Sequence, residues 1–190
     1  EKRASLSLGV IFNKDGSVCS SEIVQSLIKP NYKLTYKEAD ELIDYAPKEE
    51  EDLSLIYKIL EKRNLWRKKE GACEIIESQG KIIVKENLPF VNVIESTLSR
   101  VLVSEAMILY GDLIANFTVK NNIPVPYRVQ ENIDKFRKNN IIKLENEILT
   151  NFFLKKSMGK TYYSSIPRRH SSLGLNSYLH ATSPIRRYSD

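Results

Sequence analysis

The sequence predicts a mixed α/β fold of the α+β kind, in which antiparallel hairpins pack against several helices, one of them long and central. Two patterns lead to this prediction: apolar residues that alternate on both sides of Asp15-Gly16, and a long apolar stripe at helical spacing within residues 93–120. Strands and helices do not alternate regularly along the chain, which argues against a doubly wound parallel sheet.

The first 27 residues are expected to form a β-hairpin. Strand periodicity is seen in four apolar residues that alternate with small or polar ones: Leu6, Leu8, Val10 and Phe12. Asp15-Gly16 is a strong signal for a two-residue turn, and residues 18–27 supply the returning strand.

Two helices are expected next. Thr35 and Glu38 fit a capping box at the start of a short helix. The apolar face of that helix consists of Ala39, Leu42 and Ile43. After the acidic stretch 49–52, a second helix runs to Gly71. Its apolar residues follow the helical spacing i, i+3, i+4, i+7: Leu53, Ile56, Tyr57 and Leu60.

The second half of the chain is expected to contain a further hairpin and the long central helix. The hairpin is predicted over residues 74–84, with its turn at Gln79-Gly80. The helix is predicted over 93–120, and its apolar stripe consists of Leu98, Leu102, Ala106, Leu109, Leu113 and Phe117. Two more helical segments are predicted near 131–139 and 145–156.

Charge is distributed unevenly along the chain. Residues 1–95 carry 15 basic and 17 acidic residues, whereas residues 96–190 carry 14 basic and 7 acidic ones. Within the second half, residues 151–190 hold seven basic residues against one acid. Such a block is typical of a protein that binds a polyanion, although many basic stretches only keep a protein soluble.

Composition argues against a disulfide-rich protein, a zinc protein and a membrane-spanning protein. Cys19 and Cys73 lie far apart, and the only histidines are His170 and His180, so neither a disulfide framework nor a zinc site is predicted. No apolar run is expected to reach the roughly 18–20 residues that are needed to span a membrane. The resulting expectation is a monomeric protein without a membrane partner, located in the cytoplasm or in an organelle matrix or stroma.

The last eleven residues, 180–190, contain two adjacent arginines behind a Ser-Pro pair. Ser183 and Pro184 favour a helix start, which places Arg186 and Arg187 near the positive end of its dipole. Cations there cost roughly 0.3–1 kcal/mol each, and a bound phosphate compensates for that cost. The alternative is an i,i+4 ion pair between Arg186 and Asp190 on a solvated helix face.

Residues 180–190, HATSPIRRYSD, resemble the HFTSPIRRYxD signature of the RNase II/RNase R (RNB) exoribonucleases. Further segments resemble other parts of that family and occur in the same order. They are Leu34–Glu38, Val103–Leu109, Ile123–Val129, Tyr163-Ser164 and His170–Leu175. The resemblance therefore extends over nearly the whole chain. It implies an RNB-type catalytic domain fold.

The resemblance also implies an activity: metal-dependent hydrolysis of single-stranded RNA from its 3′ end to nucleoside 5′-monophosphates. The family holds Mg²⁺ with a cluster of aspartates that lies upstream of the segments seen here. None of the seven aspartates of this chain is adjacent to another. Residues 1–190 are therefore expected to be a partial RNB catalytic domain, without metal ligands and inactive alone, with the aspartate cluster and the flanking RNA-binding domains elsewhere.

The resemblance assigns roles to individual residues. Arg186 is expected to stabilise the transition state, a contribution of about 10²–10³ in rate for one such donor. Arg187 either holds a phosphate or pairs with Asp190. Ser183 either caps the turn or donates its hydroxyl to a phosphate. Tyr36 either stacks on the 3′-terminal base or lies over a neighbouring apolar side chain.

His170 and His180 are expected either to contact RNA or to satisfy buried backbone groups, and Tyr178 and Tyr188 to pack. Several positions differ from the family pattern, namely Ser171-Ser172, Ala181, Gln130 and Lys156. These differences support an alternative function, a catalytically inactive RNB-like protein that binds RNA or acts as a scaffold.

Overall fold

The computed structural model describes residues 2–31, 33–48, 51–73, 79–85, 87–94, 96–130 and 146–190. Its strands are β1 (Arg3–Phe12), β2 (Val18–Ile28), β3 (Gln79–Lys85), β4 (Leu88–Ile94), β5 (Tyr127–Gln130) and β6 (Thr161–Ser164). Its helices are α1 (Tyr36–Tyr45), α2 (Glu51–Lys69), α3 (Leu98–Lys120) and α5 (Glu147–Ser157), with a 3₁₀ turn at Ser171–Leu173. The strands form three antiparallel two-stranded ribbons: β1–β2, β3–β4 and β5–β6. The predicted α+β class is confirmed.

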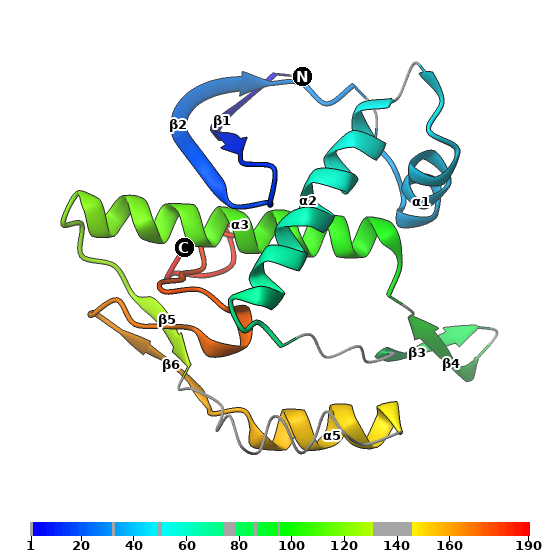
Figure 1. Cartoon of the computed structure of the whole chain (residues 1–190). Coiled ribbons are helices and arrows are strands. Elements are labelled where there is room, and N and C mark those ends of the chain that lie inside the picture. The colour runs from blue at the N-terminus through cyan, green and yellow to red at the C-terminus, as the bar shows by residue number, and fades with distance from the viewer. Residues whose placement is uncertain are drawn as a thin grey trace.

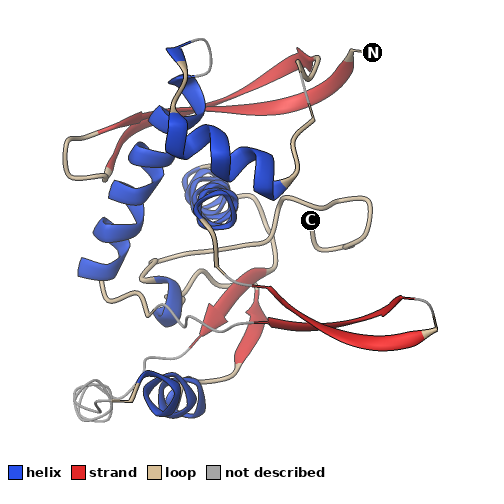
Figure 2. Cartoon of the chain, turned by 90° about the vertical axis from the view of Figure 1, so that its right-hand side faces the viewer, coloured by secondary structure: helices blue, strands red, loops and turns tan. Residues whose placement is uncertain are grey.

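Helix α3 is the axis around which the other elements are arranged (Figure 1). On one side, Leu109 and Leu113 pack with Leu60 of α2 and with apolar residues of the β1–β2 ribbon. On another side, Ala115 packs with Tyr127 and Val129 of β5 and with Leu179 of the C-terminal segment. Figure 2 looks along α3 and shows elements on several sides of it. The predicted central helix is confirmed, although Phe117 at the end of its stripe is 43% exposed.

By length and composition alone, α3 is also apolar enough to cross a membrane, with a mean hydropathy of 1.3. The expectation that no apolar run reaches that length is wrong for this helix. In the structure α3 carries Glu105 and Asp112, both buried and both in ion pairs with α2. Of the apolar window of α3, 39% is buried inside the structure.

The capping box before α1 is confirmed, and the β1–β2 turn lies at Asp15-Gly16 as predicted. The turn is longer than the predicted two residues, because three residues separate Asn13 from Ser17, whose carbonyl accepts the Asn13 N–H at 2.8 Å. Gly16 has a φ of 88° at the β1–β2 turn. A Cβ on it would lie 2.4 Å from the Lys62 carbonyl oxygen, because this turn packs on α2. Glu38 accepts a hydrogen bond from the Thr35 N–H at 2.6 Å, and Thr35 Oγ1 accepts one from the Glu38 N–H at 3.3 Å.

The second hairpin differs from its prediction. Gln79-Gly80 lies within β3, and the turn falls between Lys85 and Leu88, which pair with each other. Asn87 in this turn has a φ of 61°, a conformation that asparagine tolerates. Because Val93 pairs with Gly80, it belongs to β4, and α3 begins only at Leu98. Residues 74–78, and the predicted helix 131–139, lie outside the described residues.

Candidate functional site

The C-terminal segment folds into a tight turn, and the predicted helix after Ser183 is wrong. The Ser183 carbonyl oxygen accepts hydrogen bonds from the N–H groups of Arg186 at 3.2 Å and Arg187 at 3.1 Å. The Ser183 N–H in turn donates to Asp190 Oδ2 at 2.9 Å. Because the chain folds back on itself in this way, these two arginine N–H groups already have partners. An anion can then be held here mainly by side chains.

The carboxylate of Asp190 holds this turn together by accepting hydrogen bonds from other residues of the turn. Its side chain is fully buried and accepts hydrogen bonds from Arg187 Nε at 2.9 Å and Ser189 Oγ at 3.0 Å. Burial alone raises the pKa of Asp190, but the hydrogen bonds from Ser183 and Ser189 and the Arg187 charge lower that pKa below its ordinary value. Asp190 therefore pairs with Arg187 at i,i+3, rather than with Arg186 at i,i+4.

Arg186 stands in a different environment from its neighbour. Its side chain is exposed, and the guanidinium forms no hydrogen bond or ion pair with any residue that the structure describes. Only the backbone N–H of Arg186 is bonded, to Ser183. Ile185 and Tyr188 beside it are also fully exposed, so the prediction that Tyr188 packs is wrong. The turn thus presents one free guanidinium, while the other is held by Asp190.

Tyr178 lies between the two histidines. The ring centroid of His170 is 5.5 Å from that of Tyr178, and the centroid of His180 is 5.7 Å from it, both edge to face. His170 is only 6% exposed, so its ring is not presented to a ligand. Burial, together with the charge of Arg128, lowers the pKa of His170 to about 4. Burial, with Arg187 and Arg128, also lowers the pKa of His180, so both rings are neutral at pH 7.

The path of the chain past α3 depends on Gly111. A Cβ at this position would lie 2.4 Å from the Leu179 carbonyl oxygen and 2.5 Å from Cε2 of Tyr178. The segment is further fixed by the Arg128 N–H, which donates to the Tyr178 carbonyl at 2.8 Å. A glycine is therefore needed in the middle of the central helix to bring residues 178–180 close to it.

Two buried ion pairs join α2 to α3 behind the C-terminal segment. Arg63 Nη2 lies 2.6 Å from Asp112 Oδ2, and Arg67 Nε lies 2.8 Å from Glu105 Oε1. Arg67 also donates to the Leu173 carbonyl at 2.9 Å, which connects this network to the segment that contains His170. The two carboxylates are thus bound by guanidinium groups.

The described residues do not fit a magnesium site. Within the described ranges, no three His, Cys, Asp or Glu side chains form a group that could hold a metal ion. The buried carboxylates there, on Glu105, Asp112 and Asp190, are each paired with an arginine. The expectation of metal ligands outside these residues stays a prediction.

Tyr36 lies at the first residue of α1 and is 44% exposed. The Arg100 guanidinium stacks over its ring, 4.1 Å from the centroid, and Ser99 Oγ donates to its carbonyl at 3.0 Å. Tyr36 is thus anchored at the start of α3, whereas the C-terminal segment crosses α3 at Gly111, roughly 18 Å further along the helix axis. The structure places Ser183, Arg187, His180 and Arg186 in one segment and Tyr36 at the far end of the same helix.

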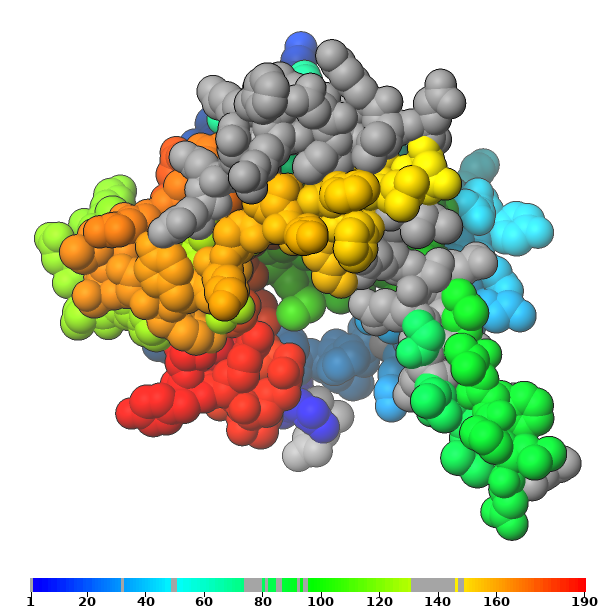
Figure 3. Space-filling model, turned by 90° about the horizontal axis from the view of Figure 1, so that it is seen from below, coloured from blue at the N-terminus to red at the C-terminus, as the bar shows by residue number. Residues whose placement is uncertain are grey.

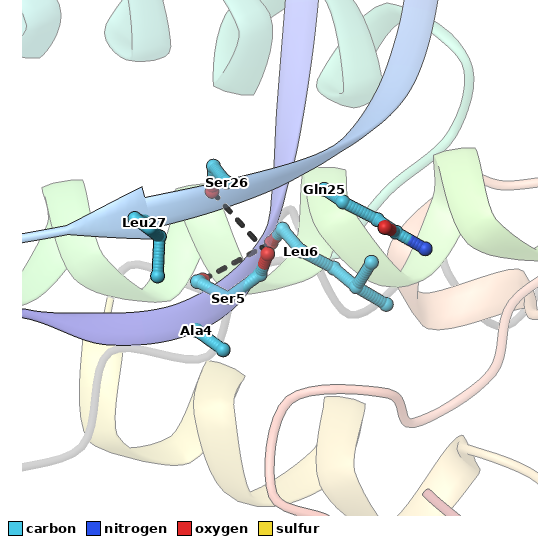
Figure 4. A pocket seen from close by; sticks show the side chains of 6 residues that line it. All are labelled: Ala4, Ser5, Leu6, Gln25, Ser26 and Leu27. Carbon is cyan, nitrogen blue, oxygen red and sulfur yellow. Dashed lines mark hydrogen bonds between the residues drawn. The ribbon is translucent and has the colours of Figure 1, made fainter.

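A pocket of about 730 Å³ is formed by the β1–β2 ribbon. It is lined by Ala4, Ser5, Leu6, Gln25, Ser26 and Leu27 (Figure 4). None of these side chains titrates, so the pocket provides no acid, base or charged group.

One basic and aromatic surface, on the β5–β6 ribbon, was not predicted from the sequence. Arg128 of β5 lies over the ring of Tyr163 in β6, 5.1 Å from its centroid. Figure 3 shows β6 and the residues after it in orange, beside the red C-terminal segment. The signal available in the sequence was the mixture of tyrosines and basic residues over 160–169.

The fold and its C-terminal segment place the chain in the RNB domain family, whose sequence model matches residues 1–190. The chain is 34% identical over 193 residues to an uncharacterized ribonuclease of Synechocystis. It is 33% identical over 204 residues to the chloroplastic/mitochondrial ribonuclease II of Arabidopsis thaliana. These matches cover 100% and 98% of this chain, but only 29% and 24% of the two relatives. The predicted family is confirmed.

Solved structures share the fold. RNase R of Mycoplasma genitalium, in complex with ribose-methylated single-stranded RNA, matches with a TM-score of 0.88 at 20% identity, over 100% of this chain and 36% of that one. Yeast Ssd1, described as a pseudonuclease, matches with a TM-score of 0.70 at 16% identity, over 100% of this chain and 28% of that one. The same architecture therefore occurs in a ribonuclease and in a pseudonuclease.

Proposed function

We propose that this chain is part of a hydrolytic exoribonuclease that degrades single-stranded RNA from the 3′ end to nucleoside 5′-monophosphates. The observation that carries the proposal is the contrast between two neighbouring arginines. The Arg187 guanidinium is held by the buried carboxylate of Asp190, whereas the Arg186 guanidinium is exposed and has no partner among the described residues. The relatives that match this chain are named ribonucleases, which agrees with the proposal.

Arg186 is proposed to act on the phosphate whose bond is broken. Negative charge grows on the phosphoryl oxygens in the transition state, and a planar guanidinium donates two parallel hydrogen bonds to such oxygens. The turn limits the movement of the Arg186 backbone, because its N–H is bonded to Ser183 and the turn is closed by Asp190.

Magnesium is part of the proposal. Bound Mg²⁺ supplies charge stabilisation and an activated water in reactions of this class. Its ligands are proposed to lie outside the described residues, because the buried carboxylates of those residues are paired with arginines. RNA is proposed to be recognised through phosphates and stacked bases rather than through base sequence. We further propose a monomer that works in the cytoplasm or in an organelle.

The alternative is a catalytically inactive RNB-like protein that binds RNA or acts as a scaffold. The fold match to Ssd1, described as a pseudonuclease, favours it, because the architecture alone does not require cleavage. In this alternative Arg186 still binds phosphate but no bond is broken.

The test compares Arg186→Ala with Arg168→Ala in the full-length protein. Arg168 is a matched control, because it is also exposed and belongs to the same basic stretch. The assay follows a 5′-labelled single-stranded RNA on a gel, with Mg²⁺ or with EDTA, at saturating protein. We expect shortening from the 3′ end that requires Mg²⁺, falls about 10²–10³-fold in Arg186→Ala, and stays near wild type in Arg168→Ala. Binding without shortening by the wild type supports the inactive alternative.

A further inference from the structure

The β5–β6 ribbon packs one face on the core through Val129, the inner face, and carries Tyr163 on the opposite, outer face. The division is not complete, because Gln130 on the outer face is buried and Tyr162 on the inner face is 38% exposed. Directly paired residues share a face, so Val129 and Tyr162 lie on one side and Arg128 and Tyr163 on the other. Val129 is only 2% exposed and packs in the cluster on α3. Tyr163, on the outer face, is 49% exposed.

Arg128 holds the Tyr163 ring in position. Its guanidinium lies over the ring, 5.1 Å from the centroid, and its Nη2 donates to Thr161 Oγ1 at 2.6 Å. The backbone of Arg128 is fixed as well, since its N–H donates to the Tyr178 carbonyl. A half-exposed aromatic ring that is already oriented loses little conformational freedom when a second flat group stacks on it.

Arg128 on this outer face lies close to the C-terminal segment, because its N–H donates to the Tyr178 carbonyl at 2.8 Å. The charges of both Arg128 and Arg187 lower the pKa of His180, so the two arginines act on the same region. Basic residues also precede and follow β6: Lys160 and Arg169. The only acid within residues 151–190 is Asp190, which Arg187 already neutralises. The surface therefore suits an anionic ligand that carries flat bases.

We propose that the outer face of the β5–β6 ribbon is an RNA-contact site, where a base of single-stranded RNA stacks on Tyr163 and Arg128 supports the ring and attracts the adjacent phosphate. This inference rests on the proposed function. It extends that function to a contact away from the bond that is cleaved, so that RNA is held at Tyr163 while Arg186 acts on the reacting phosphate. Base stacking on aromatic side chains tolerates any sequence, which suits an enzyme that moves along RNA.

The test measures the dissociation constant of a fluorescent single-stranded RNA with the full-length protein in EDTA, by anisotropy. Tyr163→Ala is expected to weaken binding roughly 5- to 150-fold, the range of one base stack. Tyr163→Phe, which keeps the ring, should stay within about twofold of wild type. Tyr162→Ala is the matched control, because it removes a tyrosine from the same strand but from the other face.

A second measurement identifies the stacking itself. RNAs with a single 2-aminopurine at successive positions report stacking as quenched fluorescence. We expect one internal position to be quenched by wild type and by Tyr163→Phe, and this quenching to be lost in Tyr163→Leu, which keeps apolar bulk on β6. Thermal melting of every variant separates loss of stacking from loss of folding.

The outcomes distinguish the two proposals. If Tyr163→Ala and Tyr163→Leu bind RNA as tightly as Tyr162→Ala, the stacking site is refuted, while cleavage that depends on Arg186 leaves the proposed function standing. If the wild-type protein neither binds nor shortens RNA, both are refuted.

Discussion

Glu105 offers the sharpest test of how this fold is held together. Its carboxylate is 2% exposed and accepts hydrogen bonds from Arg67 Nε at 2.8 Å, from Arg67 Nη2, and from Asn64 Nδ2 at 3.3 Å. Replacing Glu105 with alanine removes these acceptors but leaves the Arg67 guanidinium buried. Its one remaining described acceptor is then the Leu173 carbonyl.

The cost of Glu105→Ala follows from this geometry. Breaking a buried pair by removal of one partner typically costs 3–5 kcal/mol, because the other charge stays buried and uncompensated. With a urea slope of about 2 kcal/mol per molar, the unfolding midpoint should fall by roughly 1.5–2.5 M. Replacing both partners, Arg67→Met with Glu105→Leu, should restore most of that loss, since no buried charge is left.

Urea unfolding followed by Trp66 fluorescence measures this change. Trp66 is the single tryptophan of the sequence, and the Arg63 guanidinium lies 4.1 Å from its ring centroid, beside the same network. Glu41→Ala, at an exposed position of α1, serves as the control and should change stability by less than about 0.5 kcal/mol. A loss below 1 kcal/mol in Glu105→Ala, or a double variant no better than the single one, would show that the pair does not support the fold as argued.

Two further predictions concern packing and pH. Gly111→Ala should lower stability by about 1–3 kcal/mol, because its Cβ meets Leu179 and Tyr178. Gly80→Ala, whose nearest contact is 3.5 Å away, is the control, and equal melting temperatures would contradict the argument. His170 has its pKa lowered from 6.5 to about 4, so the unfolded chain binds the proton first and stability falls as pH drops from 6.5 toward 4. In melting curves at several pH values His170→Phe should lose this slope, and an unchanged slope would assign it to another group.

The sequence predicted those features whose causes are local. The Thr35–Glu38 capping box and the Asp15-Gly16 turn each depend on a few consecutive residues, and both are present in the structure. The prediction of a turn at Gln79-Gly80 was wrong, because a glycine can also lie inside a paired strand. Here Gly80 pairs with Val93, a partner distant in sequence.

The candidate site shows the same limit. The motif identified Arg186 and Arg187 but could not separate their environments, because that separation depends on where Asp190 lies in space. The helix expected after Ser183 failed for the same reason, since the segment forms turns that close through the hydrogen bond from the Ser183 N–H to Asp190. Tyr163 was missed because its exposure depends on the pairing of β6 with β5.

The hydrogen bond from the Ser183 N–H to Asp190 closes residues 183–190 into a ring. In such a ring the position of Arg186 depends on a residue that lies beyond it in the chain, so the number of residues matters as much as their identity. Single substitutions at the exposed Ile185 or Tyr188 leave the ring closed, whereas inserting or deleting one residue changes its circumference. The length of this segment is therefore under tighter constraint than the chemistry of its exposed side chains.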